Sequence, residues 1–156
     1  MRDKKVIQQE AENVAYTSKG LFKTADWLKN QYKICIFASF SIGLILLGFN
    51  IPVSLSKALG IVSIMIGIIL LIGEKEFKKN EQYYELANRY LGIYKDLQEI
   101  YYKGENSEKL SNLRKQIKKL DEKTSIYPIS KVGRWWSRRV IKSEMNLDWI
   151  YENKDE

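Results

Sequence analysis

The chain has 156 residues, of which 26 are Lys or Arg and 19 are Asp or Glu, so its formal net charge is +7. It has no histidine, which excludes histidine-based acid–base catalysis, nucleophile activation and metal ligation. The single cysteine, Cys35, has no partner for an intramolecular disulfide, and it lies in an apolar run where a reactive thiolate is disfavoured.

A heptad seam runs through the charged segment 1–33, which we expect to be a cytoplasmic N-terminal helix. Its members alternate at spacings of four and three residues, which predicts one long helix from about Lys5 into the following apolar run. Several members are small and allow close helix approach, either within one chain or between chains. The seam consists of Ile7, Ala11, Val14, Ser18, Leu21, Ala25, Leu28 and Tyr32.

Two apolar runs, 34–51 and 58–73, follow each other with one short turn between them, and Lys57 is the only charged residue in 34–73. At the helical rise each run spans roughly 24–27 Å, close to the ~30 Å hydrocarbon core of a bilayer. Lipid offers no partner to backbone groups, so segment 34–73 is predicted to be a transmembrane helical hairpin. The alternative, buried helices of a soluble domain, needs an apolar shell that the charged flanks do not supply. A secretory signal is not expected, because the first run begins only at Ile34.

Basic residues flank the hairpin on its outer sides, with Lys29 and Lys33 before it and Lys75, Lys78 and Lys79 after it. The positive-inside rule therefore places both termini in the cytoplasm, which predicts a multi-pass membrane protein. Basic flanks also suit an anionic leaflet, so the net charge is interpreted as a membrane signal. Direct nucleic-acid binding is not predicted.

Small residues recur in both apolar runs as small-xxx-small pairs, which let helix backbones approach closely in lipid. They pack the hairpin either against itself or against further copies. No ionisable group lies in the middle of either run, so an ion path needs several copies around it and resembles a hydrophobic gate. The candidate packing or pore-lining residues are Ser39, Ser41, Gly43, Gly60, Ser63 and Gly67.

Segment 74–156 is predicted to be a cytoplasmic helical region that begins with a helix continuous with the second run. Gly104 is expected to end this helix, and Asn106 or Ser107 to cap the next one, which folds back antiparallel. The first helix has a seam of Tyr83, Ala87, Tyr90, Tyr94, Leu97 and Tyr101, and the second has Leu110, Leu113, Ile117 and Leu120.

A last helix is expected after Pro128, with Ser130 as its cap and Val132, Trp135, Trp136 and Val140 as its apolar positions. The tail stays apolar as far as Tyr151, and the last five residues resemble a solvated end. The candidate contact residues Trp135, Trp136, Arg138 and Arg139 have three interpretations: packing against other cytoplasmic helices, contact with the lipid surface, or binding of an anionic partner or nucleotide. No phosphate-binding glycine loop occurs, so we expect neither an enzyme nor a cofactor or metal site.

The order of these parts, from about Glu10 to Trp149, resembles the SLATT domains. These are two-transmembrane effector domains associated with nucleotide-generating and nucleotide-sensing proteins in bacterial conflict systems. The most specific local piece, Tyr16 to Leu28 (YTSKGLFKTADWL), is similar to the family's Tyr-Thr-x-Lys-x-x-x-x-x-Ala segment, although Gly20 stands where the family often has a basic residue.

The resemblance implies a homo-oligomeric membrane effector of antiphage defence. It would form a pore or disrupt the membrane on a signal from a separately encoded sensor or nucleotide-signalling partner, and so cause growth arrest or cell death. A second hypothesis is a non-conducting membrane scaffold that anchors a cytoplasmic partner. A third, a holin-like lysis protein, fits the long polar arms less well. The predicted fold is therefore all-α, a transmembrane hairpin with long helices that extend into a cytoplasmic helical bundle.

Overall fold

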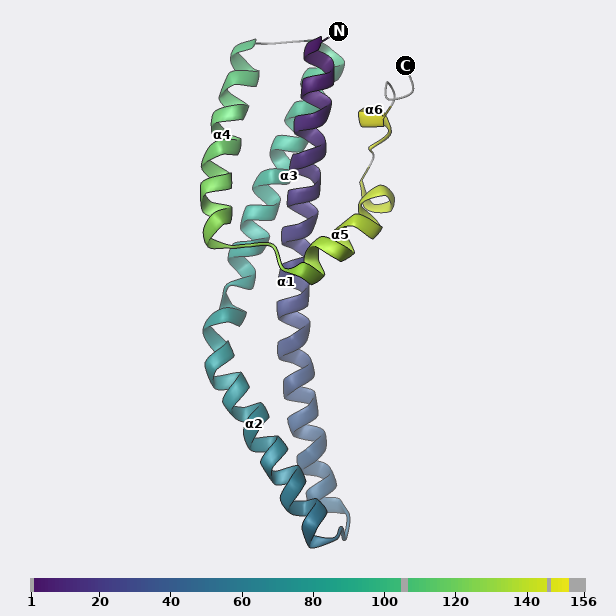
Figure 1. Cartoon of the computed structure of the whole chain (residues 1–156), viewed down its shortest axis with the longest axis vertical. Helices are drawn as coiled ribbons and strands as arrows, with labels where there is room; N and C mark the ends of the chain where they lie inside the picture. Colours follow the sequence, from purple (N-terminus) through teal and green to yellow (C-terminus); the bar gives the residue numbers. More distant parts are fainter. Residues whose placement is uncertain (1, 105–106, 146, 152–156) are drawn as a thin grey trace. The chain divides into compact units, whose positions relative to one another are not determined.

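The computed structural model describes residues 2–104, 107–145 and 147–151, and over these residues it is helical and has no strand (Figure 1). This confirms the all-α prediction. The chain forms two compact units: a first unit of residues 1–25 with 81–156, and a second unit of residues 26–80. The helices of the described residues are α1 (Arg2–Gly48), α2 (Val53–Lys78), α3 (Asn80–Lys103), α4 (Ser107–Ile126), α5 (Lys131–Glu144) and α6 (Asp148–Tyr151).

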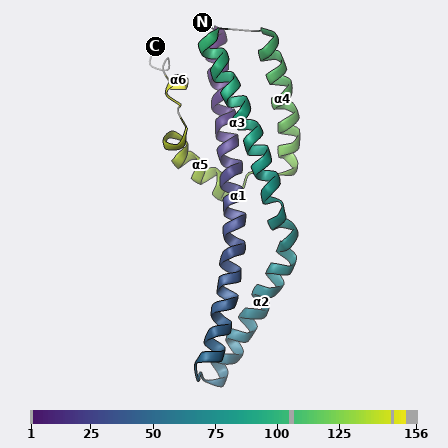
Figure 2. The same cartoon turned by 180° about the vertical axis from the view of Figure 1, so that it is seen from behind.

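The second unit consists of the later part of α1 and the whole of α2, joined by residues 49–52 (Figure 2). The limits of the two helices differ from those of the apolar runs by a few residues. α1 ends at Gly48 rather than at 51, and α2 begins at Val53 rather than at 58. Pro52 directly precedes α2, and its carbonyl accepts the backbone N–H of Ser56 at 3.0 Å. A proline is tolerated at the start of a helix because its missing N–H would have no helical partner there.

Apolar side chains cover the second unit and remain exposed. Phe37, Leu47 and Leu71 are 74, 90 and 76 % exposed, and none of the described side chains from 26 to 71 is buried. Both helices are long and apolar enough to cross a membrane, by length and composition. The alternative of two buried helices in a soluble core is therefore wrong, because the described residues provide no shell around them.

The sequence predicted that the second apolar helix continues into the next one without a break, and this is wrong. α2 ends at Lys78 and α3 begins at Asn80, with Lys79 in a turn between them. Asparagine is a weak helix former, which favours a short local break at Asn80. The charges do not explain the break, because Glu74 and Glu76 precede Lys78 and Lys79 at spacings that stabilise a helix.

The first unit has a core in which the predicted seams of α1 and α3 are buried by the chain's own helices. All the α1 seam residues as far as Ala25 are buried, and so are all those predicted for α3; Leu28 is half-buried and Tyr32 exposed. Ser18 Oγ donates to the Ala87 carbonyl at 2.8 Å, so the small side chains let the two helix backbones come close. The heptad pattern thus describes packing within one chain.

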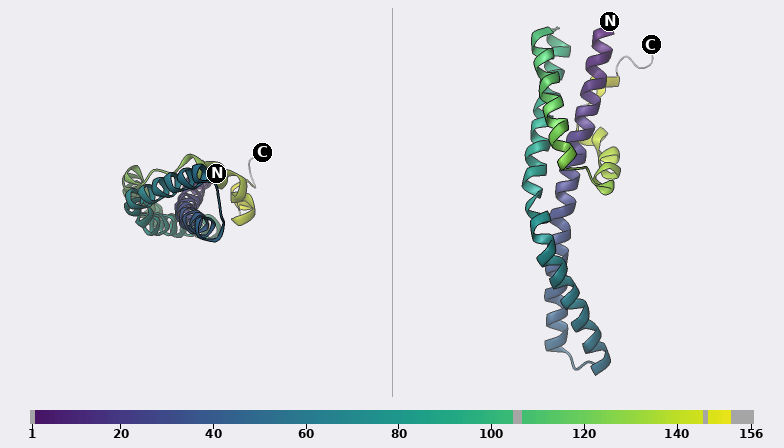
Figure 3. Two further views of the ribbon diagram at one scale, coloured as in Figure 1. Left: turned by 90° about the horizontal axis from the view of Figure 1, so that it is seen from below. Right: turned by 60° about the vertical axis from the view of Figure 1, so that its left-hand side comes forward.

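The turn between α3 and α4 is built as the sequence predicted at Gly104. Its φ of +99° lies in the region that favours glycine, and its N–H donates to the Ile100 carbonyl at 3.1 Å. α4 begins at Ser107, while Asn106, the other predicted cap, lies outside the described residues. The two helices run antiparallel, and Tyr90 of α3 donates its hydroxyl to Asp121 of α4 at 2.6 Å (Figure 3).

Helix α5 starts at the predicted cap but buries a different face from the predicted one. Ser130 Oγ accepts the Gly133 N–H at 2.9 Å, which confirms the cap. The buried residues of α5 are Gly133, Ser137 and Ile141. Of the four expected apolar positions, Val132 and Val140 are half-buried, whereas Trp135 and Trp136 are exposed. α5 crosses close to α1, and only small side chains fit between the two helices.

The apolar tail completes the core of the first unit. The short helix α6 was not predicted; it places Trp149 in the core, where its Nε1 donates to the Tyr94 hydroxyl at 3.0 Å. Gln8 of α1 donates to the Trp149 carbonyl at 2.7 Å. These bonds fix the end of the chain against α1 and α3. The last five residues, expected to be solvated, lie outside the described residues.

Candidate functional site

The six small residues singled out in the apolar runs are all half-buried in the second unit. A Cβ added to Gly43, Gly60 or Gly67 would meet no atom within 4 Å. Packing within one chain therefore does not require glycine at these three positions. Space of this kind is open to lipid tails or to a helix of another copy, since close approach in lipid depends on small residues.

Charge is confined to the edges of the second unit. Lys57, the only charged residue in 34–73, is exposed near the start of α2. The other polar side chains described in the two apolar runs are the hydroxyls of three serines, the thiol of Cys35 and, at the end of the first run, the amide of Asn50. The side chains of Lys75 and Lys78 lie outside the described residues. A membrane-spanning stretch of this composition has no group to relay a proton or to bind an ion by charge.

The tryptophans of α5 form an exposed surface together with cationic side chains. Trp135 is 56 % exposed, and the Arg139 guanidinium lies 4.2 Å from the centre of its ring. Trp136 is 36 % exposed, with Lys23 Nζ 5.3 Å from its ring centre. More than half of the Trp135 side chain is therefore open to lipid or to a partner.

The crossing of α1 and α5 depends on two glycines. The space next to Gly20 holds the Ile129 side chain, whose methyl carbons would lie 3.0 Å from an added Cβ. An added Cβ at Gly133 would clash with Thr24 Oγ1 and would lie 2.8 Å from the Gly20 carbonyl oxygen. The Ser130 N–H donates to Thr24 Oγ1 at 3.1 Å at the same point. The glycine that departs from the expected family pattern thus makes room for the start of α5.

Ion pairs hold the other end of α5 against α1. Glu144 accepts hydrogen bonds from Lys19 Nζ at 2.8 Å and from Lys23 Nζ at 3.0 Å. These two bonds hold the pKa of the Glu144 carboxyl below its ordinary value of 4.5. Lys19 belongs to the segment that carries the family resemblance, so this segment acts in part by fixing α5.

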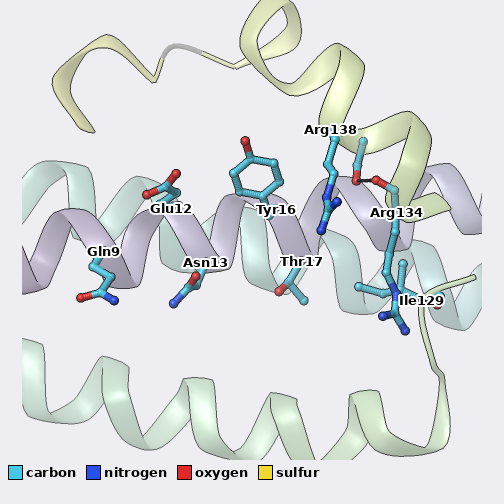
Figure 4. A pocket seen from close by; sticks show the side chains of 9 residues that line it. Gln9, Glu12, Asn13, Tyr16, Thr17, Ile129, Arg134 and Arg138 are labelled. Atoms are coloured by element: carbon cyan, nitrogen blue, oxygen red, sulfur yellow. Dashed lines mark hydrogen bonds between the residues drawn. The ribbon is translucent and has the colours of Figure 1, made fainter. Parts of the chain in front are cut away.

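A polar groove of about 730 Å³ lies on the first unit, with α1 as its floor, and α4 and α5 on opposite sides of that helix (Figure 4). Figure 4 shows Arg134 and Arg138 extending from α5 across the groove, one helical turn apart. Only Arg138 of these two was singled out from the sequence. Their spacing of four residues was the signal that could have identified the pair. The lining residues are Gln9, Glu12, Asn13, Tyr16, Thr17, Ile129, Arg134, Ser137 and Arg138.

No group of three or more Cys, Asp and Glu side chains among the described residues could hold a metal ion. The groove carries two guanidinium groups and one carboxylate, and that carboxylate, Glu12, already accepts the Tyr151 hydroxyl at 3.0 Å. Its chemistry favours an anion over a cation.

A comparison with protein families finds one match that covers nearly the whole chain. Residues 2–155 match the family model described as SMODS and SLOG-associating 2TM effector domain 6, SLATT_6. No curated protein and no solved structure matches the chain. The matched description names two transmembrane segments, which agrees with the two apolar helices of the second unit.

Proposed function

Because the chain belongs to the SLATT family of two-transmembrane effector domains, we propose that it is a membrane effector of antiphage defence whose copies assemble in the inner membrane. On a signal from a separately encoded partner, the assembly opens a pore or disrupts the membrane and causes growth arrest or cell death. The observation that carries this proposal is the second unit: two adjoining helices that expose apolar side chains and hold no charge between Ile34 and Ser56.

Three features of this unit support an assembly of several copies. Two helices are too few to enclose a water path, so a conducting state needs further copies around it. Gly43, Gly60 and Gly67 leave open space beside their backbones that packing within one chain does not use. The bilayer supplies no hydrophobic force between helices, so such close-approach positions are where association is favoured.

The wall of the proposed path follows from the same residues. Ser39, Ser41 and Ser63 are the residues of the two apolar runs that carry hydroxyl groups, and the remaining side chains are mainly aliphatic. A path of this composition conducts only when it is wetted, which makes it a hydrophobic gate without a charged filter. The absence of ionisable groups favours weak ion selectivity over a proton relay.

The first unit is proposed to face the cytoplasm and to receive the signal. The lysines that flank the apolar runs favour this orientation by the positive-inside rule. The first unit has a buried core and a charged surface. Its exposed Trp135 and Arg139 are residue types enriched at protein contacts.

The test is growth arrest and conductance with matched substitutions in α2. Gly67→Leu adds bulk where one chain alone has room for it, and we expect it to abolish toxicity and dye leakage from reconstituted vesicles without lowering membrane insertion. Ile64→Phe enlarges a side chain that is already bulky and 65 % exposed, and it should leave both activities intact. Conductance of Gly67→Leu equal to that of the unmodified protein would remove these glycines from the pore.

A second candidate function is a non-conducting scaffold, which the exposed Trp135 favours because that side chain is free to anchor a cytoplasmic partner. The two functions differ in copy number. The mass of the full-length protein in nanodiscs distinguishes them: a closed ring of several copies supports the effector, whereas a monomer or dimer without leakage activity, even with its partner present, supports the scaffold.

A further inference from the structure

The groove between α1 and α5 contains a pair of cationic side chains that the fold leaves unpaired. Arg138 makes no hydrogen bond or ion pair with any described residue, and Arg134 makes one long bond, from Nε to the Ile129 carbonyl at 3.4 Å. Like charges one helical turn apart repel each other, which destabilises a helix by a few tenths of a kcal/mol. Elsewhere on the same helix the structure compensates charge, as Glu144 does with Lys19 and Lys23.

Uncharged hydrogen-bonding groups lie on α1, along the floor of the groove. Gln9, Asn13 and Thr17 follow each other at spacings of four on α1, so they line one strip of that helix, and Figure 4 shows them together along the floor of the groove. The side chains of Gln9 and Asn13 are exposed and make no hydrogen bond with the described residues. A ligand in the groove would therefore find two guanidinium groups on one side and amide and hydroxyl groups on the other.

We propose that this groove binds a small ligand that carries phosphoryl groups, held by Arg134 and Arg138 against the α1 strip. Guanidinium groups offer paired N–H donors in a planar fork that matches phosphate oxygens, and their charge does not depend on pH in the physiological range. The volume of about 730 Å³ is within the range of small-molecule sites, roughly 300–1,000 Å³.

The composition of the groove argues against other classes of ligand. The lining has few apolar side chains, with Ile129 as the aliphatic one, so a purely hydrophobic molecule gains little there. A metal cation would meet two positive charges and one engaged carboxylate. The phosphoryl group can belong to a soluble molecule or to a lipid headgroup, and the chemistry of the two guanidinium groups is the same for both.

A bound ligand would connect α1 and α5 at a point where few other contacts join them. α5 contacts α1 through the Gly20–Gly133 crossing and the Glu144 ion pairs, and the ligand would add a third connection between them. Arg134 also borders a smaller adjoining hollow with Thr17 and Asp121, so a larger phosphorylated molecule has room to extend toward α4. The site is defined by binding alone and does not depend on pore formation.

The experiment is a calorimetric titration of the full-length protein in nanodiscs of neutral phosphatidylcholine, with inorganic pyrophosphate as the probe. We expect saturable binding that Arg134→Gln combined with Arg138→Gln weakens by about tenfold or more, because each charged hydrogen bond contributes to it. Lys131→Gln combined with Lys142→Gln removes the same charge from exposed positions of α5 outside the groove, and it should weaken binding by less than about twofold. Asn13→Leu removes an amide from the α1 strip without changing the charge, and it should also weaken the binding of pyrophosphate.

A second arm identifies the source of the phosphoryl group. Nanodiscs that contain phosphatidic acid should lower the apparent affinity for pyrophosphate if a headgroup enters the groove, and should leave it unchanged if the site takes soluble ligands; either result supports the site. Equal losses in the two double variants, or no saturable binding of pyrophosphate to the wild-type protein, would overturn the proposal. Both arginines are exposed, and the melting temperature of the variants checks that the fold persists. Leakage activity is measured separately and can fail without affecting this result.

Discussion

Gly20 and Gly133 determine how closely α1 and α5 approach each other. Their contact brings together a backbone carbonyl, the Thr24 hydroxyl and the start of α5, and the Ser130 cap lies at the same point. A buried crossing of this kind has no free volume for a methyl group, because protein interiors are close-packed. The glycines are therefore required by packing at a site where the sequence alone indicated only weak helix formers.

The first prediction concerns Gly133→Ala. The added Cβ collides with Thr24 Oγ1 and with the Gly20 carbonyl, so we expect a loss of about 1–3 kcal/mol of stability, as for other overpacked sites. Thermal unfolding in detergent, followed by the buried Trp149, measures the change. Gly92→Ala is the matched control: an added Cβ there meets nothing within 4 Å in α3, so it should raise stability by up to about 1 kcal/mol. Equal melting temperatures for the two variants would contradict the close crossing.

At the scale of single helices, periodicity predicted the buried face of those helices that pack lengthwise against another helix. The α3 seam is buried at every predicted position, because a long helix packed lengthwise on another buries a regular stripe. The same reasoning did not identify the buried face of α5, because Trp135 and Trp136, two of its expected apolar positions, are exposed. A short helix that crosses another buries what fits at the crossing, and that depends on Gly20 and Thr24, more than 100 residues earlier in the chain.

The groove was beyond sequence analysis for the same reason. Arg138 was identified as a contact residue, but Gln9, Asn13 and Thr17 carry no motif, and only the crossing of α5 over α1 brings them near it. The small residues of the apolar runs were found because spacing along one helix suffices to define their face. What these faces contact depends on copies or lipids outside the chain.

The second prediction concerns the C-terminal end of α5, which Glu144 fixes to α1. Because the pKa of this carboxyl is lower in the folded protein than its ordinary value of 4.5, its stabilising effect is present at neutral pH and is lost as the pH falls below that value. Glu144→Gln should lower stability at pH 7 by up to about 1 kcal/mol, since the pair is partly exposed. The difference from wild type should shrink as the pH falls below 4.5, and it should vanish once the pH is below the lowered pKa of the folded carboxyl.

Thermal unfolding over this pH range measures the difference. Glu85→Gln removes a carboxylate from an exposed pair with Arg89 within α3, at 2.6 Å, and it controls for the loss of a surface charge. Its effect should be smaller throughout this range, because this pair joins no two helices. A Glu144→Gln deficit that stayed constant from pH 7 to below pH 4 would show that packing, and not charge, holds this end of α5.

At the scale of the whole molecule, the two units have opposite requirements for their surroundings. The first unit buries its apolar seams and exposes charge, as a water-soluble helical domain does, whereas the second exposes most of its large apolar side chains. α1 belongs to both units, so one helix carries a seam suited to protein packing and then a surface suited to lipid. A membrane boundary along α1 would place its first part in water and its later part in lipid. The orientation of the chain across the membrane is therefore the property to test.

The third prediction is that the turn between α1 and α2 lies outside the cell membrane and that α4 lies inside. In a Cys35→Ser background, Lys57→Cys and Asn112→Cys each provide one exposed thiol, near the turn and on α4 respectively. A membrane-impermeant maleimide applied to intact spheroplasts should label Lys57→Cys, whereas Asn112→Cys should react only after lysis, because basic flanks are retained on the cytoplasmic side. The reverse pattern would invert the topology and place the groove outside the cell; labelling of both thiols before lysis would mean that the helices do not span the bilayer, and the pore proposal would fail with them.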